Sequence, residues 1–287
     1  MNVLAYNIHE CGNSIKRNRI KKLLISGNVD ICFIQETKKE KMDNGLFHFG
    51  KKGFEWSTTN AIGIFEGILT IWKKDIIYPI SSFRGKVFLG INSTWKGLNC
   101  YFVNIYSPCN LHNKRILWSY LINLRSSSSY GEWLVSGDFD VVKRNEERHS
   151  RTACCTAEMN EFCSFIDAMR LVDLPDVGNC FTWFNSSGSC RSRLDRFLLS
   201  DGLIDSWKIS AQCMGDKDVS DHRPVWIKAN HLNWGPKPFK VFKCRFDHPD
   251  FHDFVKKIGN SSHFVGSAAH VLAKKLKKYE TAITVVE

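Results

Sequence analysis

Four short motifs with metal-binding and acid–base side chains lie far apart in this chain, each beside an apolar segment. The motif residues are Asn7 in LAYNIH, Glu36 in FIQET, Asp138 in VSGDFD, and Asp221 and His222 in VSDHRP. The apolar segments have the β-branched and aromatic composition of short strands. Because a strand end directs side chains to one rim of a sheet, four such ends can meet in one site.

These residue types are the ones that hydrolysis of a phosphodiester needs: a cation on the phosphate oxygens, a base for the attacking water, and a group that stabilises the leaving oxygen. Glu36 is a hard carboxylate ligand that suits Mg²⁺, which binds few carboxylates and retains several waters. Asp138 follows Gly137, where backbone bulk is smallest, and Asp221 adds a third carboxylate beside His222. Each motif alone also fits an ordinary turn or helix cap. Their joint occurrence in this order indicates a catalytic site.

The elements that must carry these motifs follow a mixed order along the chain. Strand-like composition predicts strands at residues 3–8, 31–35, 67–72, 98–106, 133–139, 181–184, 194–198 and 224–228. Apolar residues at helical spacing predict helices over 16–25, 112–124 and 156–171. Some strands are separated by helices and others by turns alone. This order favours two sheets packed face to face with helices outside over a doubly wound parallel sheet.

The composition is that of a packed, basic protein of 287 residues. Its hydrophobic content of 43% and nine Trp exclude a disordered chain, and its length suits one large α/β domain or two small ones. The formal net charge of +11 favours a polyanionic partner, nucleic acid before an anionic membrane, although ordinary solubility charge also explains it. No segment reaches the roughly 18 consecutive apolar residues of a membrane span.

The cysteines and the first residues bear on the compartment. The chain begins MNVLAYNIHE, which lacks the basic start and apolar stretch of a secretory signal. The eleven Cys include no CxxC pair, and several lie inside apolar runs, as is typical of a reducing compartment. We therefore expect a nuclear or cytoplasmic protein that is not secreted.

The composition changes after about residue 230. The segment NWGPKPF at 233–239 holds two Pro and one Gly and interrupts regular structure. Residues 237–287 include ten Lys and Arg against five Asp and Glu, and apolar residues at helical spacing among four Lys predict a basic amphipathic helix at 268–283. Packing of this helix on an absent partner is favoured over direct contact with nucleic acid. We therefore predict a compact domain over 1–230 and a basic linker with a Lys-rich helix over 231–287.

With these motifs in place, residues 2–229 resemble the endonuclease/exonuclease/phosphatase family, which includes AP endonucleases, pancreatic-type DNases, inositol-polyphosphate phosphatases and sphingomyelinases. The motifs that carry the resemblance are LAYNIH, QET, VNIYSP with Tyr106, GDFD, SRLDRFLLS with Asp195, and the closing Ser220–Asp221–His222. The resemblance implies an α/β fold of the DNase-like kind. In that fold, two mixed β-sheets lie face to face with helices outside, as a four-layer αββα sandwich.

Four further segments resemble the endonuclease domain of plant LINE-type, non-LTR retrotransposons. They are RNEER at 144–148, GNCFTWFN at 178–185, SRLDRFLLS at 192–200 and GPKPFKVFKCRFDHPDF at 235–251. In those elements a linker and a Lys-rich helix lead to a reverse transcriptase, and no segment of this chain resembles one. The resemblance implies a monomeric, Mg²⁺-dependent endonuclease that nicks double-stranded DNA and leaves a primer 3′-hydroxyl, with no membrane partner.

The same resemblance implies roles for individual residues. Glu36, helped by Asn7 and Asp221, would hold Mg²⁺, with Mn²⁺ as the alternative ion, on the scissile phosphate. Asp138 would position or deprotonate the attacking water. Tyr106 would donate to a phosphate oxygen or assist the leaving group.

The remaining implied roles concern the acid and the DNA. Asp195 would orient His222, which donates to a phosphate oxygen. Thr182 would contact DNA near a displaced nucleotide, and Arg191 and Arg193 would contact backbone phosphates. Ser220 would also take part in substrate binding.

One departure from the family pattern bears on activity. The family motif is GDFN, and this chain has Asp140 in place of the Asn that donates a hydrogen bond toward the phosphate or water. An ionised carboxylate cannot donate a hydrogen bond, and it places negative charge beside an anionic substrate. Loss of one such donor lowers the rate on the order of a hundred- to a thousandfold. The first alternative is therefore a catalytically inactive nucleic-acid-binding remnant. The second is a cellular AP endonuclease or phosphoesterase, against which the GPKPF linker and Lys-rich helix argue.

Overall fold

A computed structural model describes ten segments of the chain, which form two compact units, Met1–His231 and Leu232–Glu287. Each unit is described by itself. The described residues are 1–39, 53–59, 67–150, 154–178, 180–228, 251–261, 264–266, 271–272, 274–276 and 278.

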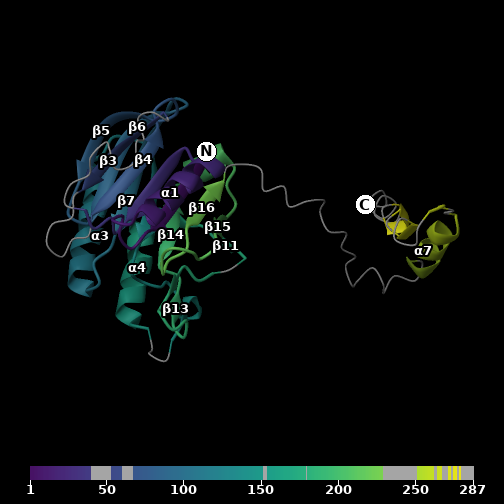
Figure 1. Ribbon diagram of the computed structural model, residues 1–287. Coiled ribbons are helices and arrows are strands. Elements are labelled where there is room, and N and C mark those ends of the chain that lie inside the picture. Colours follow the sequence, from purple (N-terminus) through teal and green to yellow (C-terminus); the bar gives the residue numbers. More distant parts are fainter. Residues whose placement is uncertain are drawn as a thin grey trace. The chain divides into compact units, whose positions relative to one another are not determined.

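The first unit is built on two large mixed β-sheets (Figure 1). The seven-stranded sheet has the order β11 (Asp176–Val177), β15 (Gln212–Met214), β16 (Val225–Lys228), β1 (Asn2–Asn7), β2 (Ile31–Gln35), β4 (Ile68–Lys73) and β3 (Phe54–Thr59). The six-stranded sheet has the order β10 (Val172–Asp173), β14 (Asp195–Leu199), β8 (Glu132–Asp138), β7 (Leu98–Tyr106), β6 (Phe88–Trp95) and β5 (Tyr78–Arg84). Within them, β1 pairs parallel with β2 and β7 pairs parallel with β8, while most other neighbours are antiparallel.

The main core lies where side chains of the two sheets meet. Val3 and Phe33 from one sheet and Phe102, Leu134 and Phe197 from the other belong to one buried cluster. Strands β1, β2 and β8 are buried along nearly their whole length because both faces of each sheet are covered. This double burial explains why their sequences are continuously apolar.

Among the described residues, helices α1 (Ser14–Ser26), α3 (Leu111–Ser127) and α4 (Thr156–Ala168) form outer layers of the first unit (Figure 1). Helix α1 buries Ile20, Leu23 and Leu24 against the seven-stranded sheet. Helices α3 and α4 cover the outer face of the six-stranded sheet. Asn side chains cap α1 and α3, because Asn13 accepts from Ile15 N–H and Asn110 accepts from Asn113 N–H. The predicted four-layer αββα sandwich is confirmed.

The structure also contains elements that the sequence patterns did not predict. These are the long strands β3, β5 and β6, the short strands β10, β11 and β15, and the helices α5 (Asp201–Trp207) and α7 (Phe251–Asn260). A small third sheet joins β12 (Trp183–Phe184), β13 (Arg191–Ser192) and β9 (Arg148–His149), the last directly after the 3₁₀ turn Asn145–Glu147. The predicted strand at 181–184 is therefore shorter than expected.

The second unit contains α7 and a further helical stretch among residues 271–278. The helix predicted at 268–283 lies partly outside the described residues, and of its apolar positions Leu272 and Leu276 are exposed. The Pro- and Gly-rich segment at 233–239 lies outside the described residues. Within the described part of the chain, no helix has the length and apolar character to cross a membrane.

Candidate active site

The predicted site residues come together because their strands end at the same rim of the sandwich. Asn7 closes β1, and parallel pairing places it opposite Gln35, the residue before Glu36. In the other sheet, Tyr106 closes β7 and pairs with Asp138 at the end of β8. A cavity of about 380 Å³ opens at this rim. Its lining includes Glu36, Tyr106, Asp138, Asp140, Asp221 and His222.

Two backbone features aim the carboxylates into this cavity. Glu36 has a φ of 53°, so the chain turns sharply after β2, a conformation that non-glycine residues adopt mainly at constrained positions. Gly137 has a φ of 139°, and a Cβ there would lie 1.9 Å from the Ile105 carbonyl oxygen. The absence of a side chain at residue 137 therefore lets β7 approach closely and carries Asp138 to the rim.

A buried amide joins the two central carboxylates. Asn7 Nδ2 donates to Glu36 Oε1 at 2.8 Å and to Asp138 Oδ2 at 3.0 Å. The Asn7 side-chain oxygen accepts from the backbone N–H of His9 at 3.0 Å. In this arrangement Asn7 positions both carboxylates, and its oxygen holds the backbone of His9.

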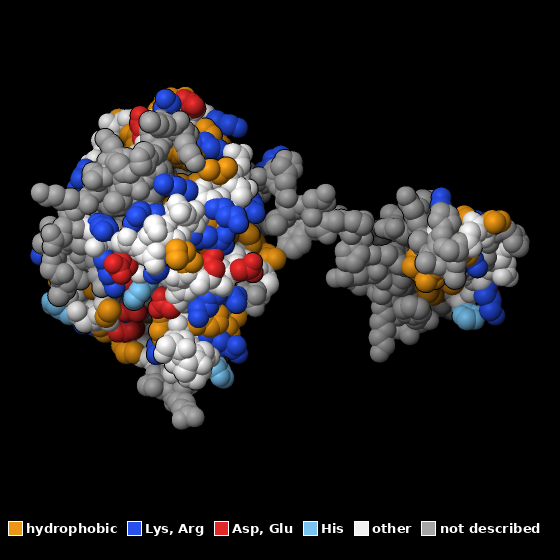
Figure 2. All heavy atoms as spheres, viewed as in Figure 1, with side chains coloured by type: hydrophobic (Ala, Val, Ile, Leu, Met, Phe, Trp, Pro, Cys, Tyr) orange, Lys and Arg blue, Asp and Glu red, His pale blue; other side chains and the backbone are white. Residues whose placement is uncertain are grey.

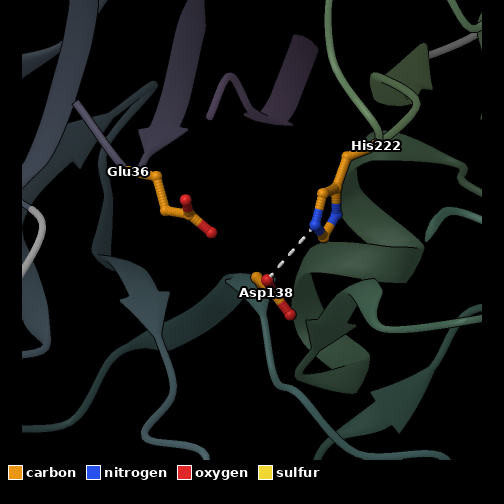
Figure 3. Close-up of side chains that lie close together, drawn as sticks. All are labelled: Glu36, Asp138 and His222. Atoms are coloured by element: carbon orange, nitrogen blue, oxygen red, sulfur yellow. Dashed lines mark ion pairs between the residues drawn. The ribbon is translucent and has the colours of Figure 1, made fainter. Parts of the chain in front are cut away.

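Among the described residues, Glu36, Asp138 and His222 bring possible metal ligands together, and the two carboxylates would hold the ion while His222 is protonated. One ligand atom from each lies within 4.8 Å of the other two, and all three residues are buried (Figure 3). Two adjacent hard carboxylates suit Mg²⁺ or Mn²⁺, which prefer oxygen ligands and complete their shells with water. Asp221 lines the same cavity, but its carboxylate accepts from Trp183 Nε1 at 3.1 Å.

Two basic side chains beside Glu36, those of His9 and Lys38, were not predicted as site residues. His9 Nδ1 lies 3.2 Å from Glu36 Oε2 and 3.8 Å from Asp221 Oδ1. Lys38 Nζ lies 3.6 Å from Glu36 Oε2. Both His9 and Lys38 line the cavity, and the Lys38 ammonium group places positive charge beside the predicted metal-binding carboxylate. Each lies two residues after a recognised site residue, His9 after Asn7 and Lys38 after Glu36, which was the available sequence signal.

His222 lies between two carboxylates. Its Nδ1 is 2.8 Å from Asp195 Oδ2, and its Nε2 is 3.7 Å from Asp138 Oδ2. Burial alone would lower the pKa of His222, but the adjacent Asp195 and Asp138 carboxylates outweigh it and raise that pKa to about 10. Burial also raises the pKa of Asp138, and His222 opposes this shift. The imidazolium is therefore stabilised at neutral pH with Nε2 directed toward Asp138.

Thr182, predicted to contact DNA, supports Asp195. It is fully buried, and its hydroxyl accepts from the backbone N–H groups of Leu194 and Asp195 at 2.9 and 3.0 Å. These bonds fix the start of β14, where Asp195 pairs with Asp138. In this structure Thr182 has a positioning role, and its contact with DNA stays a prediction.

Arg193, predicted to contact phosphates, is also buried. Its guanidinium lies in an ion-pair network with Arg196 and three carboxylates, those of Glu147, Asp173 and Asp176. These pairs leave 6% of the Arg193 side chain exposed. Arg193 therefore stabilises the segment before β14 and does not face a ligand. Arg191 is exposed and able to reach one, with its guanidinium 4.7 Å from the centre of the Phe181 ring.

Ser220 links the closing motif to the first strand. Its hydroxyl donates to the Asn7 carbonyl oxygen at 2.8 Å and accepts from the His222 backbone N–H at 3.2 Å. The residue is buried and does not line the cavity. Ser220 thus fixes His222 relative to Asn7, whereas its predicted role was substrate binding.

Asp140 adopts a left-handed backbone conformation just past the end of β8. Its φ is 48°, a region that Asp and Asn enter more readily than other side chains. Its N–H donates to Asp138 Oδ1 at 2.9 Å, and its carboxylate lines the cavity. Burial raises the pKa of Asp140, and Lys114, whose Nζ lies 3.5 Å from Asp140 Oδ2, opposes that shift.

Basic side chains gather over α1 on the face shown in Figure 2. Helix α1 carries five Lys and Arg residues and no acidic residue. Lys16 Nζ donates to the carbonyl oxygens of Ile8 and His9 at 2.9 and 2.5 Å, which holds the loop after β1. The helix therefore contributes both loop support and a positive surface close to the site.

The sequence matches no protein-family model and no curated protein. Solved structures do match in three dimensions. A 3′-5′ exonuclease from Neisseria meningitidis is 15% identical, with 80% of this chain and 100% of that chain covered and a TM-score of 0.66. An AP endonuclease from Leishmania major is 15% identical, with 78% and 86% covered and a TM-score of 0.63. The endonuclease domain of TRAS1, a telomere-specific non-LTR retrotransposon, is 15% identical, with 80% and 99% covered and a TM-score of 0.60.

This likeness establishes the fold. Residues in the compact first unit adopt the DNase-like sandwich of these nucleases, as the sequence motifs implied. At 15% identity the likeness shows the fold alone, and the chemistry of this chain depends on its own side chains at the site.

Proposed function

We propose that this chain is a divalent-metal-dependent phosphodiesterase that nicks double-stranded DNA, as the endonuclease of a LINE-type retrotransposon. The observation that carries the proposal is the convergence of Glu36, Asp138 and His222, with ligand atoms within 4.8 Å of one another at the rim of a nuclease-like fold. Asp195 behind His222 completes an acid–base pair. The net charge of +11 favours the DNA partner.

Each residue of the group has a chemical task in this proposal. A divalent cation, Mg²⁺ or Mn²⁺, held by Glu36 with Asp138 and Asp221 nearby, would neutralise charge on the scissile phosphate. Asp138, held by the N–H groups of Asn7 and Asp140, accepts a proton from the attacking water.

The acid side of the site is completed from two other strands. His222, kept cationic by Asp195, donates from Nε2 to a phosphate oxygen. Tyr106, at the end of β7 opposite Asp138, assists the same oxygen or the leaving group.

The retrotransposon assignment rests on the motif resemblance and is supported by the likeness to the TRAS1 endonuclease domain. On the same basis, residues 1–230 are assigned as the monomeric endonuclease domain, and residues 231–287 as a linker with a Lys-rich helix toward a reverse transcriptase. A nuclear or cytoplasmic location follows from the proposed substrate. The likeness to an AP endonuclease and to an exonuclease keeps a repair enzyme as the second candidate.

A supercoiled-plasmid nicking assay on the full chain tests the proposal. We expect open circles with Mg²⁺ or Mn²⁺ and none with EDTA. Glu36→Gln should lower the rate by roughly a hundredfold or more, because it removes an anionic ligand of the cation. The matched control is Asp30→Asn, since Asp30 precedes β2 at its opposite end and pairs with Lys73.

Substrate choice separates the candidates. Cleavage of intact duplexes supports the retrotransposon endonuclease, whereas cleavage confined to duplexes with abasic sites or 3′-blocked ends indicates a repair enzyme. Duplex binding with no cleavage under any divalent metal indicates the catalytically inactive remnant.

A further inference from the structure

Lys114 is a buried lysine beneath one wall of the cavity. It lies in the first turns of α3, and only 2% of its side chain is exposed. Its Nζ donates to the Asp140 carbonyl oxygen at 2.7 Å and lies 3.5 Å from both Asp140 Oδ2 and Glu158 Oε2. Both carboxylates line the cavity, whereas the ammonium group lies behind them.

A lysine is rarely buried without a charged partner, because desolvating an ammonium group is costly. Here the ammonium group has two carboxylates and one carbonyl oxygen, which account for its three N–H donors. Because Lys114 holds both the backbone and the carboxylate of Asp140, it also stabilises the left-handed turn that follows Asp138. The cluster therefore joins α3 and α4 to the end of β8.

We propose that Lys114 is a positioning residue of the active site, which neutralises Asp140 and holds its carboxylate against the cavity wall. The Asp140–Lys114 pair then stands where the resembling family has a neutral amide. This inference rests on the proposed function, since the neutralised charge matters when a phosphate enters the cavity. Without Lys114, the Asp140 and Glu158 carboxylates would both face the incoming anion.

A double-mutant cycle on the full chain tests the pair. The four proteins are the wild type, Lys114→Met, Asp140→Asn and the double variant. With Asp140 in place, Lys114→Met should lower the kcat for nicking by about tenfold or more, with little change in KM, because the repulsion acts on charge built in the transition state. In the Asp140→Asn background the same substitution should cost less than about threefold. The double variant should therefore be more active than Lys114→Met alone.

Two further variants separate charge from packing. Lys114→Gln keeps an N–H donor for the Asp140 carbonyl oxygen but removes the charge, so it should behave like Lys114→Met. Lys73→Met removes the partner of Asp30, whose carboxylate lies 2.9 Å from Lys73 Nζ, and should leave kcat unchanged. If Lys114→Met does not fold, the same cycle is run with Lys114→Gln, alone and combined with Asp140→Asn.

The outcomes are distinct. Equal losses on Lys114→Met in both backgrounds would show a structural role and overturn the inference. Full activity of Lys114→Gln would assign the effect to the hydrogen bond and also overturn it. If no variant nicks DNA, the proposed function fails, and the cycle is then measured on duplex affinity with Ca²⁺. Coupling of about threefold or more there would sustain the pair, and its absence would overturn it.

Discussion

Replacing Asp195 by Asn tests the pairing on which the proposed acid depends. Asp195 Oδ2 lies 2.8 Å from His222 Nδ1, and both residues are buried. The substitution keeps the size of the side chain and a polar group at the same place, but it removes the negative charge. Thr182 and the pairing with Asp138 continue to hold the backbone.

The expected magnitude follows from the neighbours of His222. Asp195 raises the pKa of His222 through both its charge and its hydrogen bond, against the lowering effect of burial. A neighbouring charge at this distance shifts a pKa by about 1–3 units, so the pKa should fall by about 2 units, or about 3 kcal/mol of interaction. Asp138, 3.7 Å from Nε2, remains and limits the fall.

The sign for stability follows from the direction of the shift. A folded-state pKa of about 10 exceeds the ordinary value of 6.5, so His222 contributes stability that is complete below about pH 6.5. That contribution is lost as the pH rises through the folded-state pKa. Asp195→Asn should therefore reduce stability at neutral pH and flatten its decline at alkaline pH. Because His222 stays cationic at neutral pH after a fall of about 2 units, the main effect on nicking should be an alkaline limit that moves down by about 2 pH units.

The assay is an NMR titration of the histidine ring nitrogens in the wild type and in Asp195→Asn, with thermal unfolding recorded across the same pH range. Asp30→Asn serves as the control, because it removes a paired carboxylate far along the strand from the site. An unchanged His222 pKa in Asp195→Asn would refute the pairing. A lowered pKa without a matching shift in the alkaline limit of nicking would refute the role of His222 as the acid.

Three further predictions concern residues outside this pair. Asp140→Asn should raise the rate of single-turnover nicking by about a hundredfold, because it restores one hydrogen-bond donor while Lys114 already offsets the charge. DNA affinity should change far less, and an Asp140→Asn protein that stays inert with metal bound would contradict this. Arg193→Met should lower the free energy of unfolding by about 3–5 kcal/mol, as denaturant unfolding would measure, because it breaks a buried ion-pair network. Arg191→Ala should leave the free energy of unfolding within about 0.5 kcal/mol and reduce the salt slope of DNA binding by about 1, as salt titrations would measure. Truncation at Asn233 should leave the Tm of the first unit within a few degrees, as scanning calorimetry would show, and a large loss would make the tail integral.

The sandwich and the meeting of the site residues were predictable because each motif adjoins a strand that is buried on both faces. Such strands leave a continuous apolar signal, as Ile31–Gln35 does before Glu36. The parallel pairs β1–β2 and β7–β8 then bring the ends of those strands to one rim. The sandwich was predictable from the order of elements along the chain, because helices separate some strands and turns alone separate others.

The missed strands lacked that signal. Strand β5 is exposed along most of its length at the edge of its sheet, and it contains Pro79 and two Ser. Strand β6 alternates apolar residues with Gly90, Asn92 and Ser93, which are typical of turns. Their pairing partners, and not their own composition, determine that they are strands.

The surroundings of buried polar residues were the part of the site that the motifs did not indicate. The family resemblance implied that Arg193 contacts phosphate, yet carboxylates 17 to 46 residues away in sequence surround it. Thr182 was assigned by motif position to DNA, and its hydroxyl is used by two backbone N–H groups. In both cases the motif identified a residue important to the site but not the contacts that hold it.

Lys114 shows why the effect of Asp140 could not be judged from the motif alone. Apolar residues at helical spacing predicted this helix, but a lysine among them carries no signal that it is buried. In the structure Ile116 is 57% and Tyr120 47% exposed, and the buried face carries Lys114, Leu117 and Leu121. The ammonium group therefore lies against Asp140, 26 residues further along the chain. GDFD differs from GDFN by one lost hydrogen-bond donor and one added negative charge. Lys114 offsets the charge, so the lost donor is the remaining defect.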